Sequence, residues 1–263
     1  MQQTKLKMWV GVGSYVMAGA ATVLVASQSY AADYSKAAAK PTATTATAAK
    51  APAGEGAEGG EGGEAKAKFK NKVTNKQLLA GLREGGYVIY IRHTQTTKDY
   101  ADQADPKLDL SNCDTQRKLS TKGVTQAKNI GLAFTKANIP VGDVLASDYC
   151  RAWKAADLAF GRHVKTPALN FAKAEKYTDE QKRQMSDAVT PLLVALPKPK
   201  TNTVIVGHDD VFDAATGIYP EPQGMAYILK PDGNGKFEIL ANMKAEGWVA
   251  LAKTDMAKSN TVK

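Results

Sequence analysis

The sequence predicts an α/β domain with a mainly parallel sheet, preceded by a disordered N-terminal region. Three short segments are uniformly apolar, as in strands that are covered on both faces: 88–91, 144–146 and 203–206. Helical patterns separate these segments, and such alternation is typical of α/β proteins. The turn signal PDGNG at 231–235 adds an antiparallel hairpin. We therefore expect a three-layer α/β/α domain over 72–253, followed by a flexible tail at 254–263.

Residues 1–31 have the pattern of a signal peptide. Lys5 and Lys7 precede an apolar run, and a small-x-small cleavage site ends at Ala31. An uncleaved anchor is the alternative, because the apolar stretch at 8–26 could nearly span a bilayer. Either way the remaining chain is expected to be exported, and we predict a periplasmic or secreted protein. No stable membrane insertion is expected after cleavage.

Residues 32–71 consist almost entirely of Ala, Lys, Thr, Gly and Glu. Such a segment cannot bury enough apolar surface to offset the entropy of ordering it, so we predict a disordered tether. The formal net charge of the chain is +9, which favours anionic partners in general. Nucleic acid is not expected, because the sequence contains no basic helix, zinc-finger spacing or aromatic RNA-binding motif.

Caps and apolar spacing predict four helices in the folded part. They are a helix opened near Asn75 and stopped at Gly85, one capped by Ser120, one running to Gly161, and one opened by the capping box of Thr178 and Gln181. Pro191 lies inside the last of these and is expected to kink or divide it. The chain also has two cysteines, Cys113 and Cys150, for which a disulfide and two buried thiols are both open readings.

The three apolar strands all end in chemically reactive residues. The first is followed by Arg92 and His93, the second leads to Arg151, and the third is followed by His208 and Asp209. Ligands of open parallel sheets bind beyond the carboxyl ends of the strands. We therefore expect these side chains to converge on one pocket.

This set of residues suits phosphoryl transfer. Two arginines, with a hydroxyl such as that of Thr96, would hold a tetrahedral dianion. One neutral imidazole could attack phosphorus, while a second histidine and a carboxylic acid assist. No metal or other cofactor is required, because the arginine side chains supply the positive charge. A metal site on His93, His208 and Asp209 is a rival interpretation, but the neighbouring arginines would repel a cation.

Four motifs, in this order, resemble the histidine phosphatase superfamily, whose fold is called phosphoglycerate-mutase-like. They are IRHT at 91–94, CDTQRKLSTKGVTQAKNIG at 113–131, SDYCRAWKAADLAFG at 147–161 and VIVGHDD at 204–210. The resemblance runs from about residue 85 to 230.

The resemblance implies a role for each matching residue. His93 would be the nucleophile that becomes phosphorylated, Arg92 and Arg151 would bind the phosphoryl group, and His208 would be the second, electrostatic histidine. Further residues expected to border the substrate are Thr96, Asn112 and Arg117.

Two features depart from the superfamily pattern or leave it open. Thr94 stands where the superfamily usually has glycine, and a β-branched residue there crowds the phosphate. In one branch of the superfamily the proton donor is the aspartate directly after the second histidine, which here is Asp209. In another branch it is a glutamate between the second arginine and the second histidine, and Glu175 is the nearest match. We prefer Asp209, because it is adjacent to His208.

The sequence thus predicts an exported, metal-independent phosphomonoesterase that acts on a small phosphorylated substrate through a phosphohistidine. The alternative is a protein of the same fold that binds phosphate without turnover. Neither the physiological substrate nor the oligomeric state follows from the sequence.

Overall fold

The computed structural model describes residues 69–259, with side chains through Lys253. The predicted signal peptide at 1–31 lies outside the described residues, as does the predicted tether apart from 69–71. The predicted tail at 254–263 overlaps the last residues of a helix, and residues 260–263 are not described. None of the described helices is long and apolar enough to cross a membrane.

Six strands form a single sheet in the order β3-β2-β4-β1-β5-β6. Strands β3, β2, β4 and β1 run parallel, whereas β5 and β6 are antiparallel to their neighbours. The prediction of a mainly parallel sheet closed by a hairpin is therefore confirmed. The strands are β1 (Val88–Arg92), β2 (Val141–Ala146), β3 (Val164–Lys165), β4 (Asn202–Gly207), β5 (Ala226–Pro231) and β6 (Phe237–Met243).

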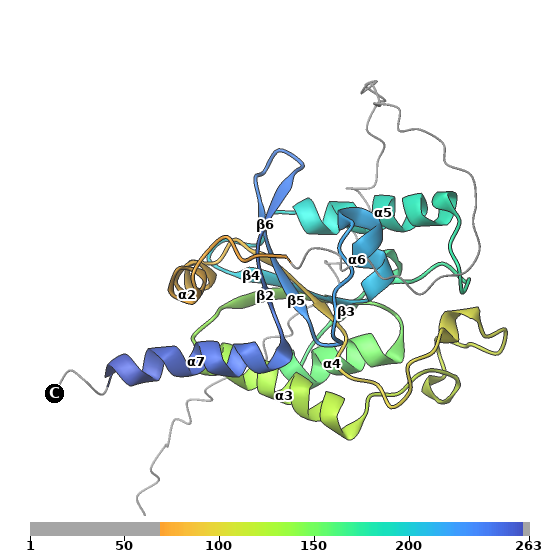
Figure 1. Cartoon of the computed structure of the whole chain (residues 1–263), viewed down its shortest axis with the longest axis horizontal. Coiled ribbons are helices and arrows are strands. Elements are labelled where there is room, and N and C mark those ends of the chain that lie inside the picture. The colour runs from red at the N-terminus through yellow and green to blue at the C-terminus, as the bar shows by residue number, and fades with distance from the viewer. Residues whose placement is uncertain (1–68, 260–263) are drawn as a thin grey trace, which may run out of the picture. The chain divides into compact units, whose positions relative to one another are not determined.

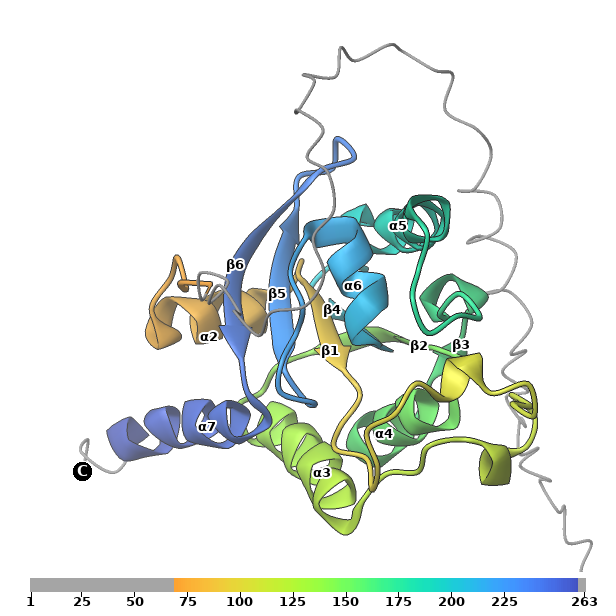
Figure 2. The same ribbon diagram turned by 45° about the vertical axis from the view of Figure 1, so that its right-hand side comes forward.

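Helices cover both faces of this sheet, which makes three layers (Figure 1). One face carries α2 (Asn75–Glu84), α3 (Thr121–Lys136), α4 (Cys150–Phe160) and α7 (Ala245–Ser259). The other face carries α5 (Asp179–Val194) and α6 (Asp209–Thr216). The turned view in Figure 2 shows α5 and α6 on the side of the sheet opposite α3 and α7.

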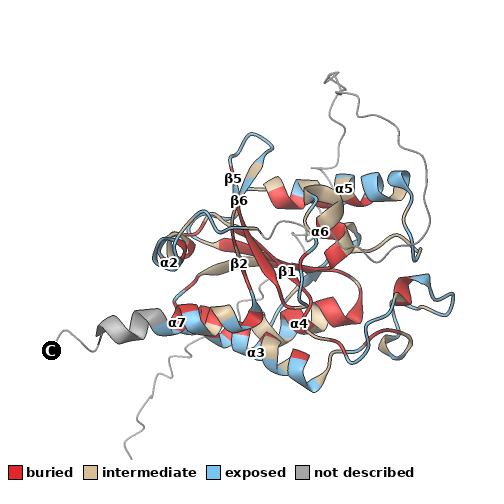
Figure 3. Ribbon diagram, in the orientation of Figure 1, coloured by how far each residue is buried: buried red, intermediate tan, exposed pale blue. Residues whose placement is uncertain are grey.

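The uniformly apolar strands supply both cores. In β1, Ile89 and Ile91 pack under the α3 layer, whereas Val88 and Tyr90 pack under the α5 layer. Successive side chains of a strand point to opposite faces, so a strand buried on both sides has no polar alternation. The burial colouring in Figure 3 shows the central strands buried along their length.

The predicted helix caps are present at Ser120 and at the Thr178–Gln181 capping box, and Gly161 ends α4 with φ of 68°. Of the two expectations for Pro191, division of the helix is wrong, because α5 runs unbroken to Val194. A proline cannot donate to the carbonyl four residues earlier, but only three residues of the helix follow Pro191. Helices α6 and α7 were not predicted.

A long irregular segment joins β1 to α3, and we call its residues 97–118 the cover segment. Its two ends are paired, since the Thr97 amide donates to the Lys118 carbonyl at 2.9 Å. It contains two short 3₁₀ turns, Asp102–Ala104 and Cys113–Thr115. A disulfide between Cys113 and Cys150 joins it to the start of α4, which decides between the two readings left open for these cysteines.

Candidate active site

The carboxyl ends of β1, β4 and β2 bring the predicted residues to one edge of the sheet. Arg92 lies opposite Gly207, the last residue of β4, and the His93 amide donates to the Gly207 carbonyl at 2.9 Å. The Ser147 amide donates to the Val206 carbonyl, which aligns the end of β2 with the same edge. As a result the rings of His93 and His208 lie 5.5 Å apart, centroid to centroid. The expected convergence of the two histidines is confirmed.

The imidazole of His93 is held as a neutral base. Its Nδ1 lies 2.9 Å from the Thr94 carbonyl, to which it donates, and its Nε2 accepts from Arg151 Nε at 3.2 Å. Burial lowers the pKa of His93 well below its usual value, and the positive charge of Arg151 adds to this effect. The free lone pair therefore lies on Nε2, the atom that faces the arginine.

His208 is fixed through both its backbone and its ring. The Tyr90 hydroxyl donates to the His208 carbonyl at 2.7 Å and accepts from its amide at 2.9 Å. Ser147 Oγ donates to Asn170 Oδ1, so it accepts from His208 Nε2 at 2.9 Å. This arrangement leaves the lone pair on Nδ1, and burial lowers the pKa of His208 well below its usual value.

The two strand-end arginines are buried and each is paired with a carboxylate. Arg92 forms an ion pair with Asp209 and donates to the Pro220 carbonyl. Arg151 donates through Nη1 to Asp102 at 2.8 Å, and its guanidinium lies over the ring of Tyr149. Because these charges are desolvated, their interaction with any further anion is stronger than it would be in water.

Thr96 and Arg117 border the site, as the resemblance implied. Arg117 Nη2 donates to Thr96 Oγ1 at 2.8 Å and forms an ion pair with Asp99. The Thr96 hydroxyl itself donates to the Lys98 carbonyl. Thr96 therefore helps to place Arg117, and the phosphate contact that the sequence suggested stays a prediction. Asn112 instead caps the second 3₁₀ turn of the cover segment and is exposed.

Buried polar atoms without a partner are concentrated at this site. The described residues contain nine such side-chain atoms, and six of them belong to the site. Buried polar groups normally have partners, so a cluster of exceptions needs an explanation. A tetrahedral oxyanion would supply acceptors for the arginine nitrogens and the threonine hydroxyl. The six atoms are Arg92 Nε, Thr94 Oγ1, Asp102 Oδ1, Arg117 Nε, Arg151 Nη2 and His208 Nδ1.

The two candidate proton donors differ in their surroundings. Asp209 is buried at the start of α6, where it contacts Arg92 and accepts from the Tyr219 hydroxyl at 2.7 Å. Glu175 is exposed, in the connection that precedes α5. The sequence did not single out Asp210, which lies beside Asp209. Burial, followed by the charge of Asp209, raises the pKa of Asp210 to about 6.

Asp102 is the principal site residue that sequence reasoning missed. Its carboxylate is fully buried, and Oδ2 accepts from both Arg151 Nη1 and the Arg117 amide. It lies in a polar segment without periodicity, so nothing in the local pattern distinguishes it from a surface aspartate. Tyr90, Ser147 and Asn170, which hold His208, were also not assigned this role.

The rival interpretation placed a metal on His93, His208 and Asp209. Within residues 69–253, no three His, Cys, Asp or Glu side chains gather as a metal-binding group. The Asp209 carboxylate is paired with Arg92, whose positive charge would oppose a cation beside it.

A pocket of about 440 Å³ lies beside Arg117 and Arg151. Its charged lining is mainly basic, with Arg117, Arg151, Lys118 and Lys154 against one carboxylate, Asp157. The Cys113–Cys150 disulfide forms part of its wall, as does a group of apolar residues: Leu119, Val124 and Leu158.

No family model matches the chain, and no curated protein matches it in sequence. Solved structures do match over the folded part. A protein histidine phosphatase, SixA, complexed with tungstate, is 16% identical over 60% of this chain and 97% of its own, with a TM-score of 0.42. A mutant phosphoserine phosphatase from Entamoeba histolytica, in complex with phosphoserine, is 12% identical over 61% and 98%, with a TM-score of 0.42. A mycobacterial glucosyl-3-phosphoglycerate phosphatase is 15% identical over 59% and 97%, with a TM-score of 0.43.

Each of these three proteins is named as a phosphatase. The motifs of the sequence pointed to the histidine phosphatase superfamily. At identities of this size a likeness concerns the fold, so the function of this chain has to be argued from its own site residues.

Proposed function

We propose that this protein is a metal-independent phosphomonoesterase of the histidine phosphatase type. One observation carries the proposal: the neutral Nε2 of His93 lies beside a buried arginine, within a cluster of polar atoms that lack partners. The Nε and Nη2 atoms of a guanidinium share one edge of its planar fork. A phosphoryl group held on that edge of Arg151 would place its phosphorus next to the nucleophile.

In the first step, His93 Nε2 attacks phosphorus and the bond between phosphorus and the ester oxygen breaks. The leaving alkoxide takes a proton from a carboxylic acid, for which Asp209 is our candidate. Asp209 would first have to leave its ion pair with Arg92 and bind a proton. Arg92, Arg151 and a protonated His208 offset the charge on the transferring oxygens. His208 gains that proton at Nδ1 when the dianion binds, because the negative charge of the dianion stabilises the buried imidazolium.

In the second step, water attacks the phosphohistidine and the phosphorus–nitrogen bond breaks. The carboxylate formed in the first step accepts the proton of the water. Inorganic phosphate leaves, and His93 returns to its neutral form. No metal takes part in either step.

Phosphate binding without turnover remains the second candidate, and burial favours it. His93 is only 1% exposed, and both strand-end arginines already have carboxylate partners. A protein that holds phosphate in this arrangement but never admits an ester would have the same contacts.

Hydrolysis of an aryl phosphate separates the two candidates. We expect turnover by the wild-type protein and a loss of about 1000-fold or more in His93→Ala. The matched control is His163→Ala, because His163 stacks on Trp153 and contacts Asp157 away from the site. Activity that resists a chelator would remove the metal alternative. Phosphate binding by calorimetry, without hydrolysis in any variant, would establish the second candidate.

The basic pocket suggests a substrate class. We propose a small phosphomonoester whose leaving group carries a second negative charge, which Lys118 and Lys154 would attract. A carboxyphenyl phosphate should then have a higher kcat/KM than phenyl phosphate at low salt, and added salt should reduce the difference. Equal values at low salt would contradict this preference.

We also propose that the protein acts outside the cytoplasm. The predicted signal peptide supports export, and so does the Cys113–Cys150 disulfide, because such bonds persist in oxidising compartments. Cell fractionation with N-terminal sequencing of the mature protein tests this, with cleavage expected after Ala31. An intact N-terminus in the membrane fraction would instead indicate the anchor.

A further inference from the structure

The reactive groups of the site are closed off from solvent. The exposed fractions are 1% for His93, 0% for His208 and 0% for Arg151. A phosphate ester cannot reach His93 Nε2 in this arrangement, so part of the protein must move for turnover. The question is which part moves and what its closure contributes.

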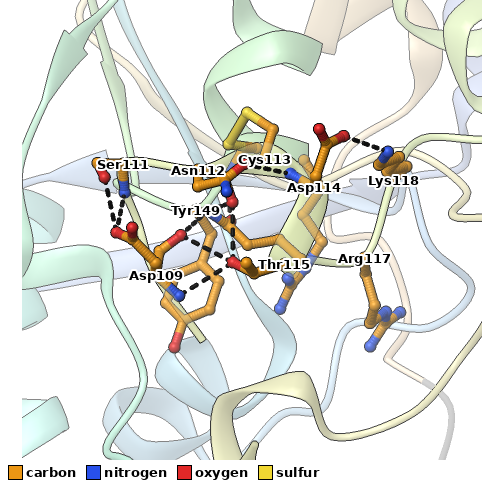
Figure 4. Close-up of a disulfide and its surroundings, with 12 residues drawn as sticks. Asp109, Ser111, Asn112, Cys113, Asp114, Thr115, Arg117, Lys118 and Tyr149 are labelled. Atoms are coloured by element: carbon orange, nitrogen blue, oxygen red, sulfur yellow. Dashed lines mark hydrogen bonds and ion pairs between the residues drawn. A yellow bond between two sulfur atoms is a disulfide. The ribbon is translucent and has the colours of Figure 1, made fainter. Parts of the chain in front are cut away.

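Backbone pairing and a disulfide hold the cover segment at its two ends, whereas its middle is held by side-chain contacts. Thr97 pairs with Lys118, and Thr96 forms a bridge with Leu119. On the C-terminal side, the Cys113–Cys150 disulfide and the bond from the Cys150 amide to Gln116 Oε1 hold it to α4. The stretch at 98–112 lies between these attachments. Figure 4 shows that Asp109, Ser111, Asn112 and Thr115 bond mainly to one another beside the disulfide.

The middle of the cover segment reaches the site through two adjacent residues. Asp102 Oδ2 contacts Arg151 Nη1 at 2.8 Å. Gln103 Nε2 donates to the Tyr177 hydroxyl at 3.0 Å, and that hydroxyl donates to Asp210 at 3.3 Å. The closed position therefore depends on the buried Asp102–Arg151 pair and on the chain of polar contacts across to α6. It also depends on Arg117, which contacts Asp99, the Tyr100 carbonyl and Asp102.

The place of Asp102 on the guanidinium matters. Nη1 does not share a donor edge with Nε, so Asp102 does not occupy the edge of Arg151 that faces His93. On that edge Nε donates to His93 Nε2, and Nη2 has no partner among the described residues. The carboxylate thus orients the arginine without occupying the position of the phosphoryl oxygens. Its second oxygen, Oδ1, has no partner among the described residues.

We infer that residues 98–112 form a lid, and that Asp102 is the positioning residue by which the closed lid aligns Arg151 with His93. The inference rests on the proposed function. Opening breaks the Asp102–Arg151 pair and admits the ester, and closure restores the pair and excludes water. Asp102 acts through Arg151 and does not itself touch the substrate.

Substitution of Asp102 tests this role. In Asp102→Asn the amide oxygen can still accept from the Arg117 amide, but the charge that holds Arg151 is lost. We expect kcat for an aryl phosphate to fall about 10- to 100-fold, since small misplacements of reacting groups have effects of that size. Affinity for inorganic phosphate, measured by calorimetry, should be unchanged or tighter, because a nearby negative charge is removed. Asp102→Glu, which keeps the charge, should recover part of kcat.

The matched control is Asp105→Asn, an exposed aspartate of the same segment whose side chain contacts only the Lys107 amide. It should behave like the wild type. If Asp102→Asn keeps kcat and only lowers the unfolding temperature, the residue is structural and the inference is wrong. A rise in kcat/KM would also overturn it, because Asp102 would then be a competitor of the substrate. A wild-type protein that binds phosphate but hydrolyses nothing would instead overturn the proposed function as well.

Hydrogen exchange in the wild-type protein tests the lid without any substitution. Amides at 98–112 should exchange faster than those of α3, and saturating phosphate should slow them. If saturating phosphate leaves the exchange rates of these amides unchanged, the stretch is not a lid that closes over the bound anion.

Discussion

The two halves of the site are built in different ways. The sheet-edge half, which contains Arg92, His93, His208 and Asp209, follows directly from strands that are hydrogen-bonded to one another. The cover half is irregular, and side-chain contacts and one disulfide hold it in place. Groups on a sheet edge keep their positions, whereas groups on an irregular segment can leave and return. In the proposed function, the sheet edge would supply the reacting groups and the cover segment would supply access and alignment.

The largest loss of kcat is expected from a substitution at the sheet edge. His208→Gln removes the imidazole that would donate to the transferring oxygens, and we expect a loss of about 1000-fold in kcat. His163→Gln is the control. Steady-state kinetics would contradict the assignment if both variants retained wild-type kcat, and the sheet edge would then not be the reactive half.

Removal of the Cys113–Cys150 disulfide tests the cover half of the site. The disulfide closes a sequence separation of 37 residues, and loop closure of that length stabilises the folded state by about 3–4 kcal/mol in the chain-entropy model. We expect the Cys113→Ser/Cys150→Ser variant to lose stability of this order in urea unfolding. Its kcat should fall less than that of His208→Gln, because the nucleophile and His208 stay on the sheet. Equal losses of kcat would remove the distinction between the two halves.

Gly207→Ala probes how tightly the sheet edge is packed. A Cβ at Gly207 would lie 2.3 Å from the Tyr90 hydroxyl, which bonds the backbone of His208 on both sides. Displacing Tyr90 should lower the free energy of unfolding by about 1–3 kcal/mol and should also reduce kcat. Tyr90→Phe removes the nearest atom and leaves the ring Cζ 2.8 Å from the added Cβ, so it should relieve part of the clash in the double variant. Additive losses in the double variant would show that Tyr90 is not the obstacle.

A further prediction concerns the dependence of stability on pH. His93 and His208 have pKa values well below their usual value in the folded state. As pH falls through about 6.5, the unfolded chain therefore binds protons that the folded chain does not, and stability decreases. Between pH 7 and pH 5 each histidine should reduce the free energy of unfolding by up to about 2 kcal/mol. Urea titrations at the two pH values measure this.

Asp210 opposes this trend. Its folded pKa is raised to about 6, so below that value the folded state binds a proton that the unfolded state does not, and stability rises. Asp210→Asn should therefore steepen the loss of stability towards pH 5, whereas His208→Gln should make it shallower. A shallower loss of stability in Asp210→Asn together with a steeper loss in His208→Gln would contradict the assignment of these two groups.

Much of the sheet-edge half could be predicted from the sequence, because its signals are local. Uniformly apolar runs identify buried parallel strands, and residues that follow such strands must meet at one edge. That is why the sequence predicts that Arg92, His93, Arg151, His208 and Asp209 lie together. The bonds that orient His208, from Tyr90 and Ser147, depend on contacts between strands and were not foreseen.

The sequence by itself determined the α/β fold, the position of its main strands along the chain and the residues at their carboxyl ends, since periodicity and caps act over a few residues. Only the tertiary structure decided that Cys113 meets Cys150 and that Asp102 lies against Arg151. Those contacts join an aperiodic segment to a distant helix. No local preference encodes them, because they form only when the whole sheet and its helices are packed.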